Sequence, residues 1–209
     1  MKLINQSCEI LNITKDPLSL IERAARTCYQ SEPEMYYGEN DWALIRRVLR
    51  KGHESVIEHA SATVKFITNR GVTHEMVRHR IAAYSQESTR YCNYGGKDME
   101  FILPVWWDDR IPFLKGTTCQ QFFWIACRQA EYNYNALIKR GWTPQQAREV
   151  LPNALKTEII TTYNFREWRH VFKLRCSKAA HPQMRALMQD CLQLFKERVP
   201  VIFEDINIG

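Results

Sequence analysis

The sequence predicts an α/β (α+β) fold, with a small central, mostly antiparallel sheet flanked by helices and a helix-rich C-terminal half. Only three stretches have the β-branched content of strands, at residues 2–13, 61–68 and 154–163. Most of the remaining chain carries apolar residues at helical spacing. Few strands among many helices are typical of helices packed on a small sheet. With 209 residues, 45% of them hydrophobic, the chain has the size of a single domain covering 1–209.

The opening segment begins with a strand and continues into a helix. Residues 2–13 mix apolar and polar positions, as an opening strand does. Asp16 and Pro17 then begin a helix, because aspartate can cap the free amides and proline suits the first turn. Apolar residues recur at helical spacing as far as Cys28, and an acidic loop, residues 31–39, ends this helix.

Two more helices surround the second strand. The first is expected from about residue 40 to Gly52, because glycine commonly ends a helix. Residues 61–68 alternate between apolar and polar side chains, which predicts a half-buried strand. Thr73 is then expected to cap a short helix that ends near Arg80.

A long loop and a long helix form the middle of the chain. Residues 93–116 are rich in glycine, proline and aspartate, which predicts a surface excursion anchored by Trp106 and Trp107. Residues 117–140 carry the broad apolar stripe of a long helix, which Gly141 ends.

The C-terminal part is mostly helical. A short helix begins at Thr143 and stops at Pro152, where the chain enters the strand at 154–163. Two helices follow, at 165–176 and 182–198, the second with an apolar face along its length.

The composition indicates an anionic partner. The net charge is +6, and 18 of the 29 cations are arginines, which grip phosphate in a bidentate fork. Net charge does not choose among a nucleic acid, a nucleotide and an anionic cofactor. The seven cysteines form no Cys-x-x-Cys pair, so neither a disulfide framework nor a zinc ribbon is indicated. The first residues lack the apolar run of a signal peptide, and no window could span a bilayer, so we expect a cytoplasmic protein without a membrane partner.

The densest chemistry of the chain begins at Arg78. The tripeptide Arg78, His79 and Arg80 is followed, after seven residues, by Ser88 and then by Arg90. Guanidinium, imidazole and hydroxyl groups together can hold phosphate oxygens and orient a polar heterocycle. Taken as charge alone, the same cluster is also typical of a solvated basic surface.

Several familiar sites are excluded by their missing motifs. There is no Gly-x-Gly-x-x-Gly and no Gly-x-x-x-x-Gly-Lys-Ser/Thr, so side chains must hold any bound phosphates. No Gly-x-Ser-x-Gly surrounds Ser88, which we therefore interpret as a hydrogen-bonding residue and not a nucleophile. The six histidines show neither His-Glu-x-x-His nor a nearby cysteine pair, so no metal is expected.

The Arg-His-Arg tripeptide, the seven-residue spacing and Ser88 together resemble the signature of the flavin-dependent thymidylate synthases. Residues 84–91 extend the similarity, and residues 52–59 resemble the His/Ser block before the family's central strand. Further similar segments follow in consistent order, so that the resemblance runs from about residue 1 to 205: 148–152, Asn164 with Arg166, and Leu174 with Arg175.

The resemblance implies a reaction and an assembly. The enzyme would convert dUMP to dTMP, with FAD as redox cofactor and with 5,10-methylenetetrahydrofolate and NADPH as co-substrates. It would be a homotetramer whose active sites are shared between subunits, without a nucleic-acid partner.

The resemblance also implies a role for each matching residue. Contacts with FAD would come from Ser55, Arg78, His79, Arg80, Gln86, Asn164, Phe165, Arg166 and His170. Contacts with dUMP would come from Glu75, Met76, Val77, Arg78, Gln86, Glu87, Ser88, Thr89, Arg90, Arg148 and Arg175.

Arg175 would be the catalytic residue in this family. A guanidinium cannot lose its proton, so it can stabilise negative charge on the uracil ring and make C5 more nucleophilic. No enzyme nucleophile is needed in that scheme, and no cysteine here precedes a histidine. Two positions depart from the family pattern, because Glu75 stands where glutamine is expected and His170 where asparagine is common.

Two other functions fit parts of the sequence. A basic nucleic-acid-binding module would use the arginines on phosphates and the aromatic residues on bases. A folate-dependent methyltransferase without redox chemistry would stay active without NADPH. Individual residues also have structural alternatives: His53 and Ser55 as helix-end or turn residues, the tryptophans as loop anchors, and Arg166 and Arg169 as partners of Glu167 and Glu158.

Overall fold

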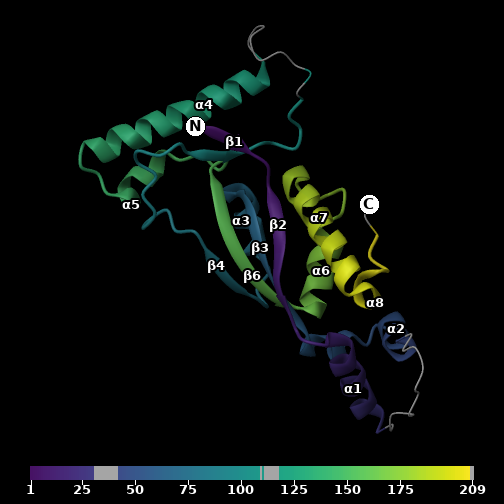
Figure 1. Cartoon of the computed structure of the whole chain (residues 1–209). Coiled ribbons are helices and arrows are strands. Elements are labelled where there is room, and N and C mark those ends of the chain that lie inside the picture. The colour runs from purple at the N-terminus through teal and green to yellow at the C-terminus, as the bar shows by residue number, and fades with distance from the viewer. Residues whose placement is uncertain (31–41, 109, 111–117, 208–209) are drawn as a thin grey trace. The chain divides into compact units, whose positions relative to one another are not determined.

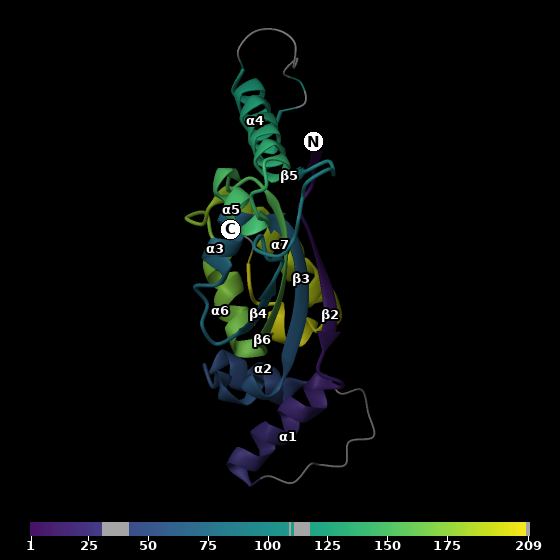
Figure 2. The same cartoon turned by 90° about the vertical axis from the view of Figure 1, so that its left-hand side faces the viewer.

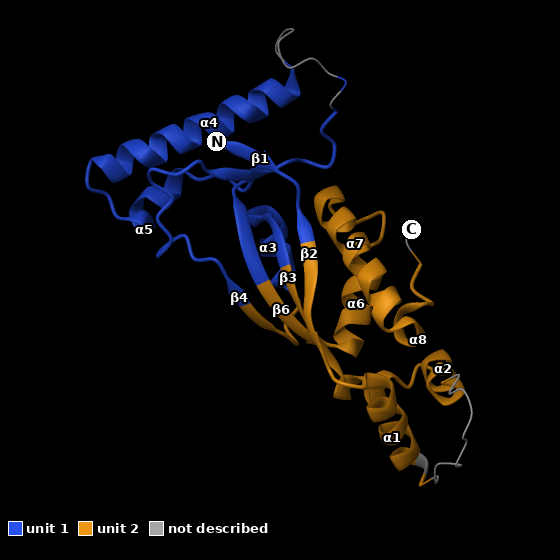
Figure 3. Ribbon diagram, viewed as in Figure 1, with its two compact units in different colours: residues 1–7, 66–78, 85–159 blue, residues 8–65, 79–84, 160–209 orange. Residues whose placement is uncertain are grey.

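The computed structural model describes residues 1–30, 42–108, 110 and 118–207, which form two compact units (Figure 3). Unit 1, blue in Figure 3, consists of residues 1–7, 66–78 and 85–159, and unit 2, orange, consists of residues 8–65, 79–84 and 160–209. Each unit is assembled from three separate stretches, so the chain passes repeatedly from one to the other. The single domain expected over 1–209 stays a prediction.

The main sheet has four strands in the order β2-β3-β6-β4 (Figure 1). They are β2 (Ser7–Ile13), β3 (Ser61–Asn69), β4 (Ala83–Gln86) and β6 (Lys156–Asn164). Along β3, buried residues alternate with half-buried ones, as the sequence predicts for a half-buried strand. The expected small antiparallel sheet flanked by helices is confirmed.

Unit 1 contains a long helix over a small core. Strand β1 (Lys2–Ile4) pairs in parallel with β5 (Glu100–Ile102), Leu3 lying opposite Phe101. The helices are α3 (Arg70–Met76), α4 (Cys119–Lys139), α5 (Pro144–Ala147) and the 3-10 helix η2 (Arg148–Val150). The core consists of Met99, Phe101, Cys127, Tyr134, Ala147 and Leu155.

Unit 2 is mostly helical. Its helices are α1 (Pro17–Tyr29), α2 (Ala43–Arg50), the 3-10 helix η1 (Glu54–His59), α6 (Phe165–Arg175), α7 (Pro182–Arg198) and α8 (Pro200–Phe203). Helix α1 packs on α2, and α6 packs on α7 and on η1 (Figures 1 and 2). Trp168 of α6 stacks on Phe172 with 5.3 Å between ring centroids, and its Nε1 donates to the Ala62 carbonyl of β3 at 3.1 Å. Aromatic packing and this bond hold α6 in place.

Arg169 is a buried cation that ties three segments of unit 2 together. Its Nε lies 3.1 Å from Glu54 Oε1, and its two terminal nitrogens lie 2.6 and 2.7 Å from the Asp205 carboxylate. A terminal nitrogen also donates to the Ile202 carbonyl. The Arg169 guanidinium holds the pKa of Asp205 below its usual value.

Three expected details near the N-terminus and α3 are wrong. The strand over 2–13 is two strands, because β1 pairs with β5 whereas β2 pairs with β3. Asp16 has a left-handed φ of 46° and makes no side-chain capping bond. Thr73 is a buried residue inside α3, which ends at Met76 and is capped by Asn69 Oδ1, the acceptor of the Val72 N–H at 2.8 Å.

The long loop is anchored only in part as expected. Trp106 is 62% exposed, and Trp107 makes an edge contact with Phe123 of α4 at 6.2 Å between centroids. Trp107 is half-buried and thus one of the expected anchors, and the buried Met99 and Phe101 hold the same segment. Helix α4 begins after Thr118, which accepts the Gln121 N–H. Some predictions lie outside the described residues. They are the acidic loop and the start of the next helix, within 31–41, and the end of the long loop with the first residue of the long helix, within 111–117.

None of the described helices is both long enough and apolar enough to cross a membrane.

Candidate functional site

The residues that were assigned to ligands divide between the two units. Unit 1 holds most of the residues assigned to dUMP: Glu75, Met76, Val77, Arg78, Gln86, Glu87, Ser88, Thr89, Arg90 and Arg148. Unit 2 holds Arg175 and most of the residues assigned to FAD: Ser55, His79, Arg80, Asn164, Phe165, Arg166 and His170. The boundary crosses the Arg-His-Arg tripeptide between Arg78 and His79.

In unit 1, Gln86 is held at the end of β4 by two threonines. Its Nε2 donates to Thr73 Oγ1 at 2.9 Å and to Thr157 Oγ1 at 3.2 Å. Both hydroxyls belong to fully buried residues, so the amide has a fixed orientation. Because its N–H groups are used, the Oε1 acceptor is what this side chain can offer a ligand.

Glu87 anchors the start of the next turn. Its carboxylate accepts the Tyr94 hydroxyl at 2.6 Å and lies 3.3 Å from Lys156 Nζ, which also contacts Glu158 at 2.7 Å. Burial and the Glu87 carboxylate raise the pKa of Tyr94, so the hydroxyl stays a donor. The Glu87 side chain is therefore committed within the protein and positions the residues that follow it.

The turn that follows contains Ser88 and Arg90. The Ser88 carbonyl accepts the N–H groups of Tyr91 and Cys92 at 3.2 and 2.9 Å, and its Oγ accepts the Arg90 N–H at 3.3 Å. The exposed Arg90 guanidinium lies over the Tyr91 ring, 5.4 Å from its centroid. These bonds fix a tight turn that presents a hydroxyl and a cation together.

Arg148 is joined to this turn by Thr89. A terminal nitrogen of Arg148 donates to Thr89 Oγ1 at 3.4 Å, and its Nε lies 3.4 Å from Glu149. Thr89 is buried. Of the α3 residues assigned to dUMP, Met76 is buried in the core, whereas Glu75 is half-buried, so the two differ in how their side chains could reach a ligand.

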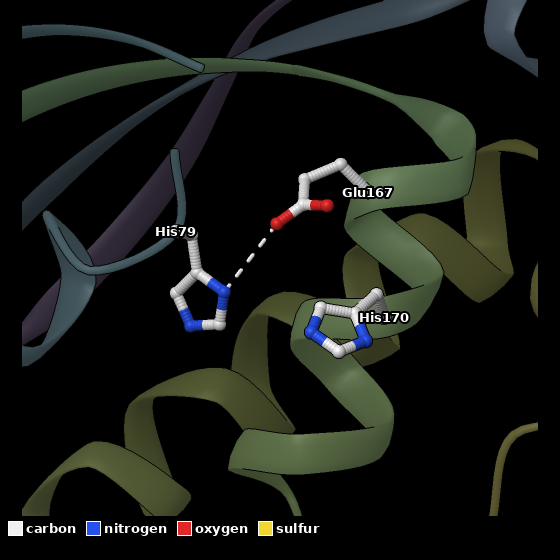
Figure 4. Close-up of side chains that lie close together, drawn as sticks. All are labelled: His79, Glu167 and His170. Atoms are coloured by element: carbon white, nitrogen blue, oxygen red, sulfur yellow. Dashed lines mark ion pairs between the residues drawn. The ribbon is translucent and has the colours of Figure 1, made fainter. Parts of the chain in front are cut away.

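In unit 2, His79 bridges two residues of α6 (Figure 4). His79 Nδ1 lies 3.4 Å from Glu167 Oε1, and Arg175 Nε donates to His79 Nε2 at 3.1 Å. Figure 4 shows Glu167 and His170 projecting from α6 toward the His79 ring, whose centroid lies 5.9 Å from that of His170. Thus the structure brings Arg175, the expected catalytic residue, into contact with His79, which was expected to contact FAD together with the neighbouring His170.

His79 is kept neutral by its surroundings. The residue is 6% exposed, and burial, followed by the nearby Arg175 and His170, lowers its pKa from 6.5 to about 4. Burial also raises the pKa of Glu167. An Arg Nε always carries a proton, so His79 Nε2 is the acceptor and the imidazole proton lies on Nδ1, facing Glu167.

The same three side chains have the composition of a metal site. The ligand atoms of His79, Glu167 and His170 lie within 4.8 Å of one another. A metal on His79 Nδ1 would require the proton on Nε2, where Arg175 already donates. The N–H groups of His79 Nε2 and Arg175 Nε would then face each other. In addition, the positive charge of Arg175 would repel a dication.

Two tyrosines lie beside this cluster. The Tyr84 hydroxyl donates to the His79 carbonyl and lies 3.0 Å from the Tyr163 hydroxyl. Tyr163 is buried against Trp168, with 4.4 Å between ring centroids. Burial raises the pKa of both tyrosines, so they remain neutral donors.

The remaining residues assigned to FAD have different surroundings. Asn164 caps α6, its Oδ1 accepting the Glu167 N–H at 2.8 Å. Phe165 is buried against Phe203, so its ring belongs to the core. Arg166 is exposed and lies 2.5 Å from Glu58, and Ser55 is exposed on η1. The sequence suggested Glu167 and Glu158 as partners of Arg166 and Arg169. In the contacts described above, neither arginine pairs with either of these glutamates.

Sequence reasoning missed the residues that orient the site. Glu167, Tyr84 and Tyr163 received no role, although Glu167 was named as a partner for arginines. Glu167 follows its cap by three residues, so its place in the first turn of a helix was readable. Glu167 also contacts His79, which lies 88 positions earlier in the sequence. No local sequence pattern could predict this contact.

Comparison with known proteins gives consistent matches along the chain. A family model described as "Thymidylate synthase complementing protein" matches residues 9–201. A flavin-dependent thymidylate synthase of Geobacter sulfurreducens is 37% identical over 206 residues, covering 96% of this chain and 86% of the relative. The enzymes of Corynebacterium efficiens and Mycobacterium tuberculosis are 35% and 34% identical over 202 and 204 residues, each covering 91% of this chain and 80% of the relative.

Proposed function

The chain belongs to the flavin-dependent thymidylate synthase family, and we propose that it converts dUMP to dTMP with FAD, 5,10-methylenetetrahydrofolate and NADPH. It is an enzyme of dTMP synthesis, a methyltransferase that uses a flavin. The bond between Arg175 and His79 supports the proposal most directly, because it joins the assigned catalytic cation to the signature tripeptide within one unit.

The residues of unit 2 have the chemistry that a flavin dinucleotide requires. Arg80 and Arg166 are exposed cations that suit a pyrophosphate. Arg166 is paired with Glu58, but an exposed pair is weak enough for a phosphate to recruit the guanidinium. His170 is exposed and can supply an imidazole nitrogen to a polar ring system, whereas both nitrogens of the buried His79 already face Glu167 and Arg175. When bound, the flavin supplies the redox chemistry that reductive methylation needs.

The turn in unit 1 suits a nucleoside monophosphate. Ser88, Arg90 and Arg148 offer a hydroxyl and two cations to a phosphate dianion. Gln86 offers a fixed acceptor, which suits a ring N–H of a base. Glu87 keeps the turn in place through Tyr94 and Lys156, so we assign it a positioning role toward dUMP.

Arg175 is the residue we propose for activation of dUMP. Its charge does not depend on pH, and His79 holds its Nε in one direction. A fixed cation beside the uracil would stabilise negative charge on the ring, so that C5 becomes the nucleophile without a covalent bond to the enzyme. The family resemblance also supports a homotetramer with active sites shared between subunits, which gel filtration tests.

An activity assay tests this function. Purified protein should absorb near 450 nm or so, as flavoproteins do, and form dTMP only when dUMP, 5,10-methylenetetrahydrofolate and NADPH are all present. Arg175→Ala should keep the flavin absorption and lose about a hundredfold or more in turnover, since a preorganised charge at the reacting ring is removed. Arg198→Ala, which removes an exposed arginine from the end of α7, is the control and should be unaffected.

The outcomes separate the competing functions. Unchanged turnover in Arg175→Ala would contradict the assigned role. Full activity without NADPH would indicate a folate-dependent methyltransferase without redox chemistry. A colourless protein with salt-sensitive binding to RNA or DNA would indicate a nucleic-acid-binding module.

A further inference from the structure

We propose that Glu167 is a positioning residue for Arg175 and acts on it through His79. This inference rests on the proposed role of Arg175 and extends it. The carboxylate fixes which imidazole nitrogen carries the proton, and the imidazole then holds the guanidinium in one orientation.

The three residues are joined by two contacts with a defined direction. Glu167 Oε1 lies 3.4 Å from His79 Nδ1, and His79 Nε2 accepts from Arg175 Nε at 3.1 Å. A neutral imidazole has one donor nitrogen and one acceptor nitrogen. A carboxylate at Nδ1 favours the proton there, which leaves the Nε2 lone pair for the arginine. Without the carboxylate, the proton could move to Nε2, where it would oppose Arg175.

The bridge is needed because of where Glu167 and Arg175 lie on α6. Glu167 is in the first turn and Arg175 is the last residue, eight positions later. At 1.5 Å per residue this separation is roughly 12 Å along the axis, so the two residues are not neighbours on the helix surface, where side chains three or four positions apart meet. His79, which enters from the segment 79–84, spans the gap.

Other contacts hold Glu167 and His79 in place. Asn164 accepts the Glu167 N–H at 2.8 Å, which fixes the first turn of α6. The Tyr84 hydroxyl donates to the His79 carbonyl. His79 is buried, so water cannot easily replace its two partners.

The charged and titratable groups around His79 agree with this assignment. Glu167, His170 and Arg175 face it from α6, Tyr84 from β4 and Tyr163 from β6. Burial, followed by the nearby Arg175 and His170, lowers the pKa of His79 and keeps the imidazole neutral, and burial keeps the two tyrosines neutral. A neutral His79 is what the chain of contacts requires, because an imidazolium has no acceptor nitrogen.

A purely structural role for Glu167 is the competing explanation. A carboxylate in the first turn of a helix stabilises that helix through its dipole, whatever lies beyond it. That role would change stability and leave the tautomer of His79 and the kinetics of the enzyme unaffected.

The tautomer can be measured directly in the unaltered protein. Solid-state NMR of flavin-loaded enzyme labelled with 15N-histidine, assigned by comparison with His79→Asn, should show His79 protonated on Nδ1 at pH 7. A proton on Nε2 would overturn the proposal even if every Glu167 variant failed to fold.

Variants of Glu167 test the effect on dUMP. Glu167→Ala should lower kcat/KM for dUMP about tenfold to a hundredfold, the scale expected when a reacting group is displaced by about an ångström. Glu167→Gln keeps an acceptor for the Nδ1 proton and should recover most of that loss. Glu197→Ala, which removes an exposed glutamate from α7, is the matched control and should match the parent.

Combining Glu167→Ala with Arg175→Ala tests whether Glu167 acts on dUMP through Arg175. In flavin-loaded protein, Glu167→Ala should weaken dUMP binding measured by calorimetry, but should add nothing in the Arg175→Ala background. Additive losses would show that Glu167 acts independently of Arg175 and would overturn the proposal. Loss of flavin from Glu167→Ala with normal kcat at saturating FAD would overturn it as well.

The proposed function and this inference can fail separately. Normal turnover in Arg175→Ala would overturn the role of Arg175, and the positioning role with it. An impaired Arg175→Ala together with a normal Glu167→Ala would overturn the positioning role alone.

Discussion

At the scale of single residues, the chemical type of a side chain follows from the sequence, but the residues that it contacts do not. His79 and Glu87 both sit in the signature region, and both were assigned to ligands. In the structure, Glu87 contacts Tyr94 and Lys156, whereas His79 contacts Glu167 and Arg175. Each contact joins residues at least seven positions apart in the sequence, so no local pattern predicted it.

The neutrality of His79 predicts how stability depends on pH. Its pKa in the folded protein is about 4, against 6.5 for an unperturbed histidine. Between these values the unfolded chain binds the proton more readily, so the free energy of unfolding should fall as pH drops from 6.5 to 4, by about 3 kcal/mol at most. Glu167 opposes part of this loss, because its raised pKa favours proton binding by the folded state.

Chemical denaturation at several pH values checks the prediction. His79→Asn removes the titrating group, so its stability should depend less on pH between 6.5 and 4 than that of the parent. Asp205, whose pKa is lowered, loses its contribution below about pH 4 and does not interfere in this window. Equal pH dependence of the two proteins would contradict the assignment to His79.

At the scale of elements, local sequence signals predicted most helices and strands. The alternation in 61–68 and the run of β-formers before Asn164 gave β3 and β6, and Gly52, with φ of +73°, follows the end of α2 as expected. The errors occurred where a tertiary partner decided the outcome. Strand 2–13 is divided because its halves pair with different strands.

The two asparagine caps allow a matched experiment on elements. Asn69 caps α3 and Asn164 caps α6, each accepting the N–H three residues later at 2.8 Å. Replacement of either by alanine should lower stability by about 1 kcal/mol, because one capping bond is lost. Only Asn164→Ala should also weaken FAD binding, measured by quenching of flavin fluorescence. An equal loss of FAD affinity in Asn69→Ala would contradict a specific role for Asn164.

At the scale of the whole molecule, the assigned ligand residues divide into two sets. Those for dUMP belong mostly to unit 1 and those for FAD mostly to unit 2, although both units are built from interleaved stretches of chain. Neither set is contiguous in sequence. The division follows from the fold and could not be predicted from the order of the motifs.

Hydrogen exchange measured by mass spectrometry tests this division. Bound ligands slow exchange where they stabilise the structure. FAD added to flavin-free protein should protect residues 79–84 and 164–175 most strongly, whereas dUMP added to flavin-loaded protein should protect residues 86–92 and 148–150. Protection by FAD confined to the dUMP segments would contradict the assignment of the two sets.

The sequence alone determined the family resemblance, the helix-rich fold with a small sheet, and the arginines available for phosphate. These depend on residue type and on spacing along the chain, which local physics and motif comparison can use. Only the tertiary structure decided which side chains meet, including the bond from Arg175 to His79 and the contact of His79 with Glu167. Burial and long-range pairing set the pKa and tautomer of His79, and neither is encoded in any local stretch of residues.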